Sequence, residues 1–436
     1  MNFLKKCAKR YTETNLVLRI LIGMIIGIVL ALLVPSWSWV GILGDVFVGA
    51  LKGIAPVLVF VLIASSLAAG QNKLDRKFGF VLMLYMVSTF LAAVVAVVGS
   101  FLFPQTLVLT EAAQADVIPQ GIGEVLKNLL LNVVSNPIAS IANANYIGIL
   151  FWAVLFGLAM KKIAESYGKT LMVNISDSIA MIVRWIINLA PFGILGLVFQ
   201  AVSTNGLSIF KTYGSLLVLL VGSMLAVALL VDPLMAAIAL RRNPYPLVFR
   251  CLQKSGITAF FTRSSAANIP VNMALCEELG LDKDMYSVSI PLGATINMDG
   301  AAITITIMTL AAAHTTGVPV DIPSAILLSI LAALGACGAS GVAGGSLLLI
   351  PMACSLFGIP NDVAMQVVGV GFIIGVVQDS VETMINSSGD VMFAATAEYH
   401  DWIKKGRTLP GFLYSKKQRE ALGIDKDFVP GHNTAE

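Results

Sequence analysis

The chain has 436 residues, of which 57% are hydrophobic and only 12% are charged. Soluble proteins average about 25% charged residues, so this composition excludes an ordinary soluble domain and predicts lipid as the main solvent. The net charge of +3 says little about partners, and no basic cluster interleaved with aromatic residues suggests a nucleic acid. Five scattered cysteines without a C-x-x-C pair, and only three histidines, indicate neither a zinc site nor a redox pair.

Apolar runs fill the N-terminal part of the chain. The first follows a basic N-terminus and is too long for a signal peptide, so we predict an uncleaved first span. A helix needs about 20 apolar residues to cross the hydrocarbon core of a bilayer. The runs that qualify are 16–34, 41–69, 78–103, 138–160, 171–200 and 214–240.

Lysine and arginine lie in alternate loops. They gather before the first run, between the second and third, between the fourth and fifth, after the sixth and after the last. The opposite loops carry Glu111, Asp116 and Asp321 with few bases. Because basic loops stay in the cytoplasm, we predict a multi-pass protein of the bacterial inner membrane. Both termini would be cytoplasmic, and the number of full spans would be even.

The remaining apolar runs, 257–274, 286–313, 322–357 and 363–396, are not all single spans. Run 322–357 is uncharged, too long for one span, and contains GACGASGVAGG at 335–345. Each glycine lowers helix stability by about 1 kcal/mol against alanine, so we predict a break and a re-entrant helical hairpin. A second hairpin is predicted at 246–274, around TRSSAAN at 262–268. Two hairpins leave eight full spans, and the predicted fold class is an all-α membrane protein.

The two predicted hairpins form an inverted repeat. Each has a small, polar tip and is followed by a span with acidic residues; one would enter from the cytoplasm and the other from outside. In transporters, inverted repeats place the binding site near the membrane midplane, at the repeat interface.

The last span carries the densest polar pattern. Asp379, Thr383, Asn386 and Asp390 follow at i, i+4, i+7 and i+11, which places them on one helix face with Glu382 at its edge. An ionised group at membrane depth costs at least about 2.5–3.5 kcal/mol, so these carboxylates need cationic partners. A substrate ammonium and Na⁺ fit this requirement, whereas Asp390 alone would also fit a helix end in water.

Two other spans carry polar groups that fit a cation, each with a structural alternative. GATINMDG at 293–300 predicts local unwinding, which frees backbone carbonyls beside Asp299. The alternative is a glycine kink with Asp299 in a salt bridge elsewhere. Tyr85, Ser88 and Thr89 share one face of the third span, a pattern more typical of hydrogen bonds between helices than of ion ligation.

Isolated charges in the apolar runs also need partners. Arg263, at the first hairpin tip, cannot lose its proton, and its candidate partners are Glu382 and Asp379. A structural pair or a helix end is predicted for the lone charges Asp177, Arg184 and Asp232.

At these residues the chain resembles the dicarboxylate/amino acid:cation symporters. The matching sequences are TRSS at 262–265, PLGATINMDG at 291–300, the glycine-rich tip and NSSGD at 386–390. The resemblance covers nearly the whole chain and implies a homotrimer with an elevator-type mechanism. Its scaffold would be 1–70 and 105–205, and its sliding transport domain 71–104 and 206–400, with hairpins at about 244–275 and 321–357. Residues 401–436 would form a cytoplasmic tail.

The resemblance also implies ligands. Asp379 and Thr383 would hold the substrate ammonium, and Ser265 and Asn386 its α-carboxylate. The implied substrate-binding residues are Ser264, Ser265, Val342, Asp379, Thr383 and Asn386. Three sodium ions would be bound, the first by Gly293, Asn297, Asn386 and Asp390, the second by Thr295, Ala336, Cys337 and Ala339, and the third by Tyr85, Thr89, Asn297 and Asp299.

Departures from the family pattern bear on the substrate. Members that carry acidic substrates have a threonine where Ala301 stands and an arginine where Glu382 stands. A glutamate there repels aspartate and glutamate, so we predict sodium-coupled import of a small neutral amino acid, serine or threonine. The tip also lacks the usual proline, since the chain reads Gly-Val-Ala at 341–343. We hypothesise that Glu382 pairs with Arg263 in some states.

Three alternatives were weighed. A channel would show a continuous polar stripe through several spans, whereas these polar residues converge on one region. A membrane enzyme would need a histidine or lysine base near Ser264 or Ser265 at membrane depth, which the sequence lacks. A symporter with proton coupling or dicarboxylate cargo stays open.

Overall fold

The computed structural model describes residues 16–69, 76–109, 133–339 and 344–430, and every regular element in these ranges is helical. The predicted all-α class is therefore confirmed for the described residues. Within these ranges, the helical runs long and apolar enough to cross a bilayer are Ser38–Ser65, Phe78–Leu102, Ser166–Asn188, Gly206–Leu240, Lys283–Thr316 and Asn361–Lys404.

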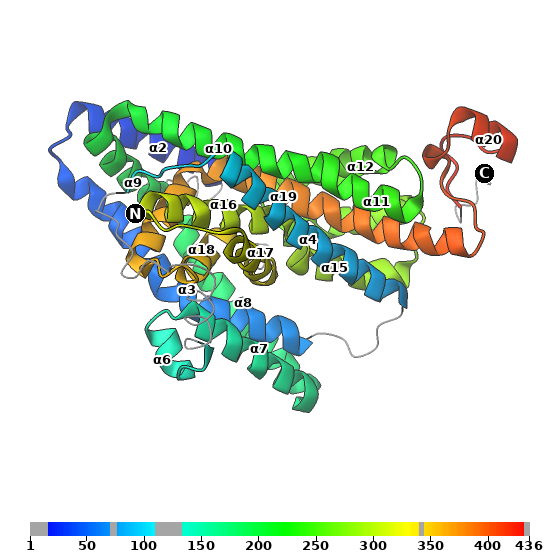
Figure 1. The fold of residues 1–436 in the computed structure, drawn as a ribbon, viewed down its shortest axis with the longest axis horizontal. Coiled ribbons are helices and arrows are strands. Elements are labelled where there is room, and N and C mark those ends of the chain that lie inside the picture. Colours follow the sequence, from blue (N-terminus) through cyan, green and yellow to red (C-terminus); the bar gives the residue numbers. More distant parts are fainter. Residues whose placement is uncertain (1–15, 70–75, 110–132, 340–343, 431–436) are drawn as a thin grey trace, which may run out of the picture.

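One group of helices comes from the N-terminal half and lies at the left and lower side of Figure 1. Its members pack mainly on one another and are α2 (Leu16–Leu33), η1 (Ser38–Gly41), α3 (Ile42–Ala69), α6 (Pro137–Ala142), α7 (Tyr146–Ile163), α8 (Ser166–Asn188) and α9 (Ala190–Asn205). Glycines let the backbones touch. A Cβ on Gly23 of α2 would lie 2.2 Å from the carbonyl oxygen of Pro191 on α9. One on Gly196 of α9 would lie 2.3 Å from the amide nitrogen of Gly44 on α3. Close backbone packing of this kind holds helices together in lipid.

Two spans predicted in this group are interrupted in the structure. Run 138–160 is divided between α6 and α7, because the Asn145 side chain accepts a hydrogen bond from Gly148 N at 3.3 Å and starts a new helix. Run 171–200 is divided between α8 and α9 at Leu189. Pro191 has no N–H, and its ring clashes with the carbonyl four residues earlier. The prediction of one uninterrupted helix was therefore wrong for both runs.

The count of eight spans stays a prediction. Helices α2 and α7 have 18 residues each, which at 1.5 Å per residue gives about 27 Å. That length is close to the thickness of the hydrocarbon core. Many large apolar side chains on α2 are exposed, including Ile22, Ile25 and Val29, as expected for a surface that faces lipid or another subunit.

A second, longer group runs along the long axis of Figure 1. It begins with α4 (Arg76–Leu102) and continues with η2 (Gly206–Ser208), α10 (Ile209–Ala226), the π-helix η3 (Val227–Val231) and α11 (Asp232–Leu240). At its centre lie α16 (Asp299–Thr316), buried along nearly its whole length, and α19 (Asn361–Lys404), buried over most of its length. A helix buried on all sides belongs to the core of the bundle.

Both predicted hairpins are present as helical hairpins. The first rises through α12 (Tyr245–Cys251), the π-helix η4 (Leu252–Gly256) and α13 (Ile257–Thr262), and returns as α14 (Ser265–Glu278). Its turn consists of Arg263, with a left-handed φ of 52°, and Ser264. The second consists of α17 (Ile322–Ala336), η5 (Ser346–Leu349) and α18 (Ile350–Ser355). Its outermost tip, 340–343, lies outside the described residues, and the re-entrant placement of both hairpins stays a prediction.

The predicted unwinding of the seventh span is confirmed. Helix α15 (Lys283–Ile296) ends before Asn297 and Met298, and α16 begins at Asp299. Each hairpin is followed by a span that carries acidic residues, and the inverted repeat stays a prediction.

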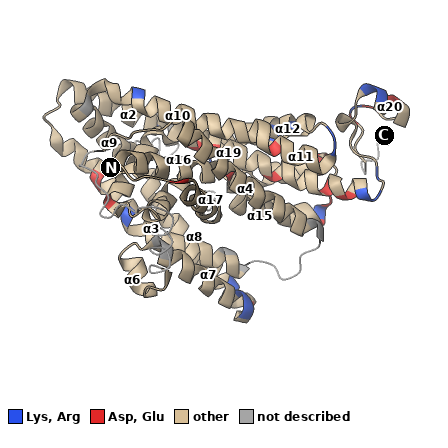
Figure 2. Cartoon of the chain, viewed as in Figure 1, with Lys and Arg blue, Asp and Glu red and all other residues tan. Residues whose placement is uncertain are grey.

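The C-terminal segment packs on the bundle. After α19 come η6 (Gly411–Leu413) and α20 (Lys416–Leu422), at the right of Figure 1. Leu409, Phe412 and Leu413 are buried, and the Arg250 guanidinium of α12 lies 4.4 Å from the Phe412 ring centroid. Figure 2 shows long helical surfaces without any charge, with Lys and Arg gathered at α20 and near helix ends.

Candidate functional site

Asp379 on α19 lies between the two hairpins. Its Oδ2 accepts a hydrogen bond from Arg263 Nε at 2.7 Å, and its Oδ1 accepts one from Gly344 N at 3.3 Å. The Asp379 and Arg263 side chains are 4% and 10% exposed, so this is a buried ion pair. Such a pair is held mainly by the cost of leaving either charge alone. Thr383, one turn along, donates its hydroxyl to the Asp379 carbonyl at 2.7 Å.

The hypothesised Glu382–Arg263 pair is not formed in this structure. Arg263 pairs with Asp379, the other candidate. The Glu382 carboxylate points instead toward α16 and η5, where its Oε2 accepts hydrogen bonds from Thr304 Oγ1 at 2.8 Å and Ser346 Oγ at 2.9 Å. Asp379 and Glu382 are neighbours on the surface of α19, but their carboxylates accept hydrogen bonds from different elements.

Asp390 lies further toward the C-terminal end of α19 than Asp379, beside the break between α15 and α16. Asn297 Nδ2 donates to Asp390 Oδ1 and to the Asn386 carbonyl, both at 3.1 Å. Tyr85 OH of α4 donates to the Asp390 carbonyl at 3.0 Å. The second oxygen of Asp390, Oδ2, and the Asn297 Oδ1 are buried without a hydrogen-bond donor among the described residues. Buried acceptors without donors are costly, and carboxylate and amide oxygens are ligands that a hard cation prefers.

Two glycines make room for this cluster. A Cβ on Gly293 of α15 would lie 2.7 Å from Asp390 Oδ1, and one on Gly389 would lie 2.7 Å from Asn297 Nδ2. Because a Cβ cannot approach that closely, any other residue at either position would displace the Asp390 or Asn297 side chain. Both glycines therefore allow the hydrogen bond between these side chains.

Asn386 has a role that the sequence did not indicate. Its Oδ1 accepts a hydrogen bond from Gly300 N at 2.8 Å and so satisfies a free N–H in the first turn of α16. Its carbonyl faces Asn297. The implied contact with a substrate carboxylate would use the remaining Nδ2, which lies 3.4 Å from Met298 Sδ.

Asp299 belongs to a cluster with α4 and α11. Ser88 Oγ lies 2.7 Å from Asp299 Oδ2 and 2.8 Å from Asp232 Oδ1, and Thr89 Oγ1 lies 2.9 Å from Asp299 Oδ1. Among the described residues Asp299 has no salt bridge, so the alternative of a paired structural charge is not realised there. Asp232, for which a structural pair or a helix end was predicted, shares the Ser88 hydroxyl with Asp299 and has no salt bridge among the described residues. Its position in the middle of an apolar run was the available signal.

The other implied ligands occupy three places. Ser264 caps α14 by accepting a hydrogen bond from Ala267 N at 3.2 Å, and Ser265 is buried beside it. Cys337 Sγ lies 3.6 Å from the Ile296 carbonyl, which brings the start of the second tip to the end of α15, next to Thr295. The nearby Ala336 and Ala339 are buried. Val342 lies outside the described residues.

A buried polar cluster was missed by the sequence reasoning. Asn268 Nδ2 on α14 donates to Ser387 Oγ at 2.7 Å and to Ser255 Oγ at 3.0 Å, and Asn272 Nδ2 donates to the Ser387 carbonyl at 3.1 Å. These bonds join both arms of the first hairpin to α19. The two asparagines are four residues apart, so their helical spacing was the signal that could have shown them on one face.

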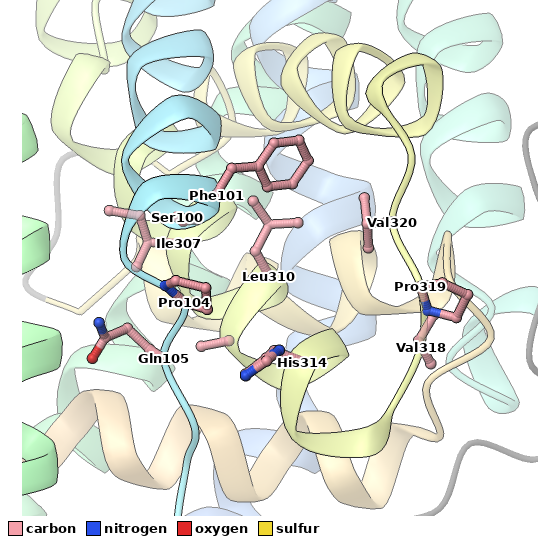
Figure 3. A pocket seen from close by; sticks show the side chains of 11 residues that line it. Ser100, Phe101, Pro104, Gln105, Ile307, Leu310, His314, Val318, Pro319 and Val320 are labelled. Atoms are coloured by element: carbon pink, nitrogen blue, oxygen red, sulfur yellow. The ribbon is translucent and has the colours of Figure 1, made fainter.

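A separate pocket of about 310 Å³ lies between the end of α4, the end of α16 and the loop after it. Figure 3 shows its largely apolar lining, with Phe101 and Leu310 on one side and Gln105 and His314 at one end. It shares no residue with the clusters around Asp379, Asp390 and Asp299. We therefore exclude it from the candidate site.

The model of the sodium:dicarboxylate symporter family matches residues 16–399. The chain belongs to this family. It is accordingly a multi-pass membrane protein of a transporter family, not an enzyme. The chain is 68% identical over 415 residues to the serine/threonine transporter SstT of Bifidobacterium adolescentis, covering 95% of this chain and 96% of that protein.

Two further relatives carry the same name. The SstT proteins of Streptococcus agalactiae and Streptococcus thermophilus are 58% and 54% identical to the chain over 403 and 402 residues. Each match covers 92% of this chain and 100% of the relative. The similarity thus extends over both helix groups, including the candidate site.

Proposed function

We propose that the chain imports serine and threonine together with Na⁺ across a bacterial inner membrane. The names of its relatives support the substrate, since they match the chain over nearly their whole length. Family membership supports the ion. The structural observation that carries the proposal is the pair of buried oxygens, Asp390 Oδ2 and Asn297 Oδ1, without donors among the described residues.

Sodium is the co-substrate that these oxygens suit. At the break after α15, the chain no longer satisfies all its carbonyls within a helix, and freed carbonyls with a carboxylate are typical ligands of Na⁺ in broken spans. Asp390, Asn297 and the Asn386 carbonyl are already brought together at this break by the hydrogen bonds of Asn297 Nδ2. We assign the first sodium ion there, and the second to the meeting of α15 with the start of the second hairpin tip.

The substrate ammonium is assigned to Asp379, which faces both hairpin tips. Asp379 supplies the negative charge, and Thr383 supplies a hydroxyl one turn away. Glu382 lies three residues from Asp379, so a substrate with a side-chain carboxylate would meet a second acidic group. The absence of a compensating base at 382, together with Ala301, supports a neutral amino acid with a small side chain.

An elevator-type motion and a homotrimer complete the proposal. The grouping of helices supports the motion, since α2, α3 and α7–α9 pack mainly on one another and apart from the bundle around α19. The second group, with both hairpins, would slide against the first. Cytoplasmic termini follow from the alternation of basic loops.

The test is uptake of radiolabelled serine into proteoliposomes under an imposed Na⁺ gradient. We expect accumulation that collapses when K⁺ or choline replaces Na⁺, is competed by threonine, and is unaffected by aspartate. A proton gradient without Na⁺ serves as the control for the alternative coupling ion. Uptake that ignores Na⁺, or that aspartate blocks and threonine does not, would overturn the proposal.

A further inference from the structure

The carboxylate of Glu382 is held on one oxygen by three donors. Thr304 Oγ1, Ser346 Oγ and Gln378 Nε2 lie 2.8, 2.9 and 2.5 Å from Glu382 Oε2. Glu382 is 5% exposed, and its three donors are at most 1% exposed. We call these four residues the Glu382 cluster. Hydrogen bonds to an ionised acceptor are shorter and stronger than neutral ones. The Glu382 cluster therefore fixes the positions of the elements that carry its donors.

The donors come from three different elements. Gln378 is one turn earlier on α19 itself, Thr304 is on α16, and Ser346 is the first residue of η5, on the returning arm of the second hairpin. Gln378 Nε2 also lies 2.7 Å from Thr304 Oγ1. These two side chains are therefore hydrogen-bonded to each other as well as to the carboxylate. Gly300 allows α16 to come this close, because a Cβ there would lie 2.8 Å from the Glu382 Cα.

Ser346 differs from the other two donors. Glu382 is the only hydrogen-bond partner that its hydroxyl has among the described residues. Two residues before it, Gly344 N donates to Asp379. Among the described residues, two hydrogen bonds therefore join the returning arm to α19, at Asp379 and at Glu382, and only the second of them uses a side chain of the hairpin.

We propose that Glu382 is a positioning residue that fixes the returning arm of the second hairpin through Ser346, while Thr304 and Gln378 keep its carboxylate in place. The proposal rests on the proposed function, because that hairpin carries implied substrate and sodium ligands at 336–342. The hydrogen bond of Ser346 holds the arm two residues after Gly344, which itself contacts Asp379. Glu382 thus contributes to binding without touching Na⁺.

The test compares Ser346→Ala with Ser346→Thr, which keeps the hydroxyl, in the full-length protein in nanodiscs with saturating Na⁺. Hydrogen–deuterium exchange of peptides covering 344–355 reports the arm directly. We expect exchange to rise roughly tenfold in Ser346→Ala, the loss expected for one hydrogen bond to a charged group, and to stay near wild type in Ser346→Thr. The KM for serine should rise by a similar factor with kcat little changed.

Ser329→Ala is the matched control. Ser329 is a buried serine on the outgoing arm α17 of the same hairpin, and it donates to the Ala325 carbonyl of its own helix at 3.0 Å. It should leave exchange and KM unchanged. In a Glu382→Gln background, Ser346→Ala should have a much smaller effect than in the wild type, because the two residues act through one contact.

Three results would overturn the proposal: wild-type exchange in Ser346→Ala, equal exchange in the Ala and Thr variants, or additive effects with Glu382→Gln. If Ser346→Ala fails to fold, Glu382→Gln alone carries the test, since it keeps the shape and loses the charge. Failure of the proposed function would look different. Wild-type protein would then not take up serine with Na⁺, whatever the exchange of the arm.

Discussion

Asp379 receives one donor from each hairpin, the Arg263 guanidinium at 2.7 Å and the Gly344 amide at 3.3 Å. One side chain of α19 thus joins two tips that are separated by about 80 residues of sequence. An ammonium that binds Asp379 competes with Arg263 for the same carboxylate. The pair therefore keeps this buried charge compensated when no substrate is bound.

Replacing Arg263 tests this reading at a single residue. Arg263→Gln should leave the Asp379 charge without a partner and destabilise the substrate-free protein by about 3–5 kcal/mol. Serine with Na⁺ supplies a new cation, so it should raise the Tm of the variant more than that of the wild type. Thermal unfolding with and without serine measures both effects. Equal serine-induced shifts would contradict the competition.

A second residue-scale prediction concerns the oxygens without donors. Asp390→Asn keeps the shape of the side chain and removes its charge, so we expect Na⁺ binding in the absence of serine to weaken by at least tenfold, about 1.4 kcal/mol. Titration of Tm against Na⁺ measures this directly. Asp362→Asn, on an exposed acid far from the break, should leave the titration unchanged.

At the scale of elements, the break between α15 and α16 depends on the close approach of α15 to α19 and α4. Gly293 lies against Asp390 and Tyr85, with virtual Cβ distances of 2.7 and 3.0 Å. Asn386 of α19 then caps the first turn of α16. The glycine contacts, the Asn386 cap and the hydrogen bonds of Asn297 therefore join α15, α16 and the unwound link to α19.

Two glycine substitutions should have opposite signs. Gly293→Ala inserts a methyl group into this contact and should destabilise the protein by about 1–3 kcal/mol, and Na⁺ should protect it less. Gly222→Ala on α10 meets no heavy atom within 4 Å and should stabilise by about 0.5–1 kcal/mol, the usual gain of alanine over glycine in a helix. Thermal unfolding of both variants, with and without Na⁺, distinguishes the steric effect of the added methyl group from the higher helix propensity of alanine.

The elements also show where sequence reasoning succeeds. The glycines, asparagine and aspartate of 293–300 conflict with a helix locally, so their break was predictable, as was the turn of the first hairpin. The interruptions at Asn145 and Leu189 were missed because a single asparagine or proline within a long apolar run changes its average hydropathy little. The partnership of Asp232 with Ser88 and Asp299 depends on which faces of α4, α11 and α16 meet. One sequence does not show this.

At the scale of the whole molecule, one polar contact between the two helix groups is an exposed ion pair. Lys52 of α3 forms an ion pair with Asp362 at the start of α19, with side chains 42% and 73% exposed. Exposed pairs of this kind contribute about 0.2–1 kcal/mol. Such a contact is weak enough to break if the second group slides along the first.

A cross-link at this pair tests the sliding. In a background without the native cysteines, Lys52→Cys with Asp362→Cys joined by a short bifunctional maleimide should abolish serine uptake and leave serine binding intact. Each single cysteine treated with the same reagent is the control. Full uptake after complete cross-linking would exclude movement of one group against the other.

The C-terminal segment has a practical consequence for handling the protein. Leu409, Phe412 and Leu413 are buried, and Val429 lies against Gly280, where a Cβ would approach its Cγ1 to 2.7 Å. These residues cover apolar surface at the base of the first hairpin. A truncation that removes them would expose this apolar surface to water and promote aggregation in detergent. An affinity tag placed after Glu436 would leave these contacts intact.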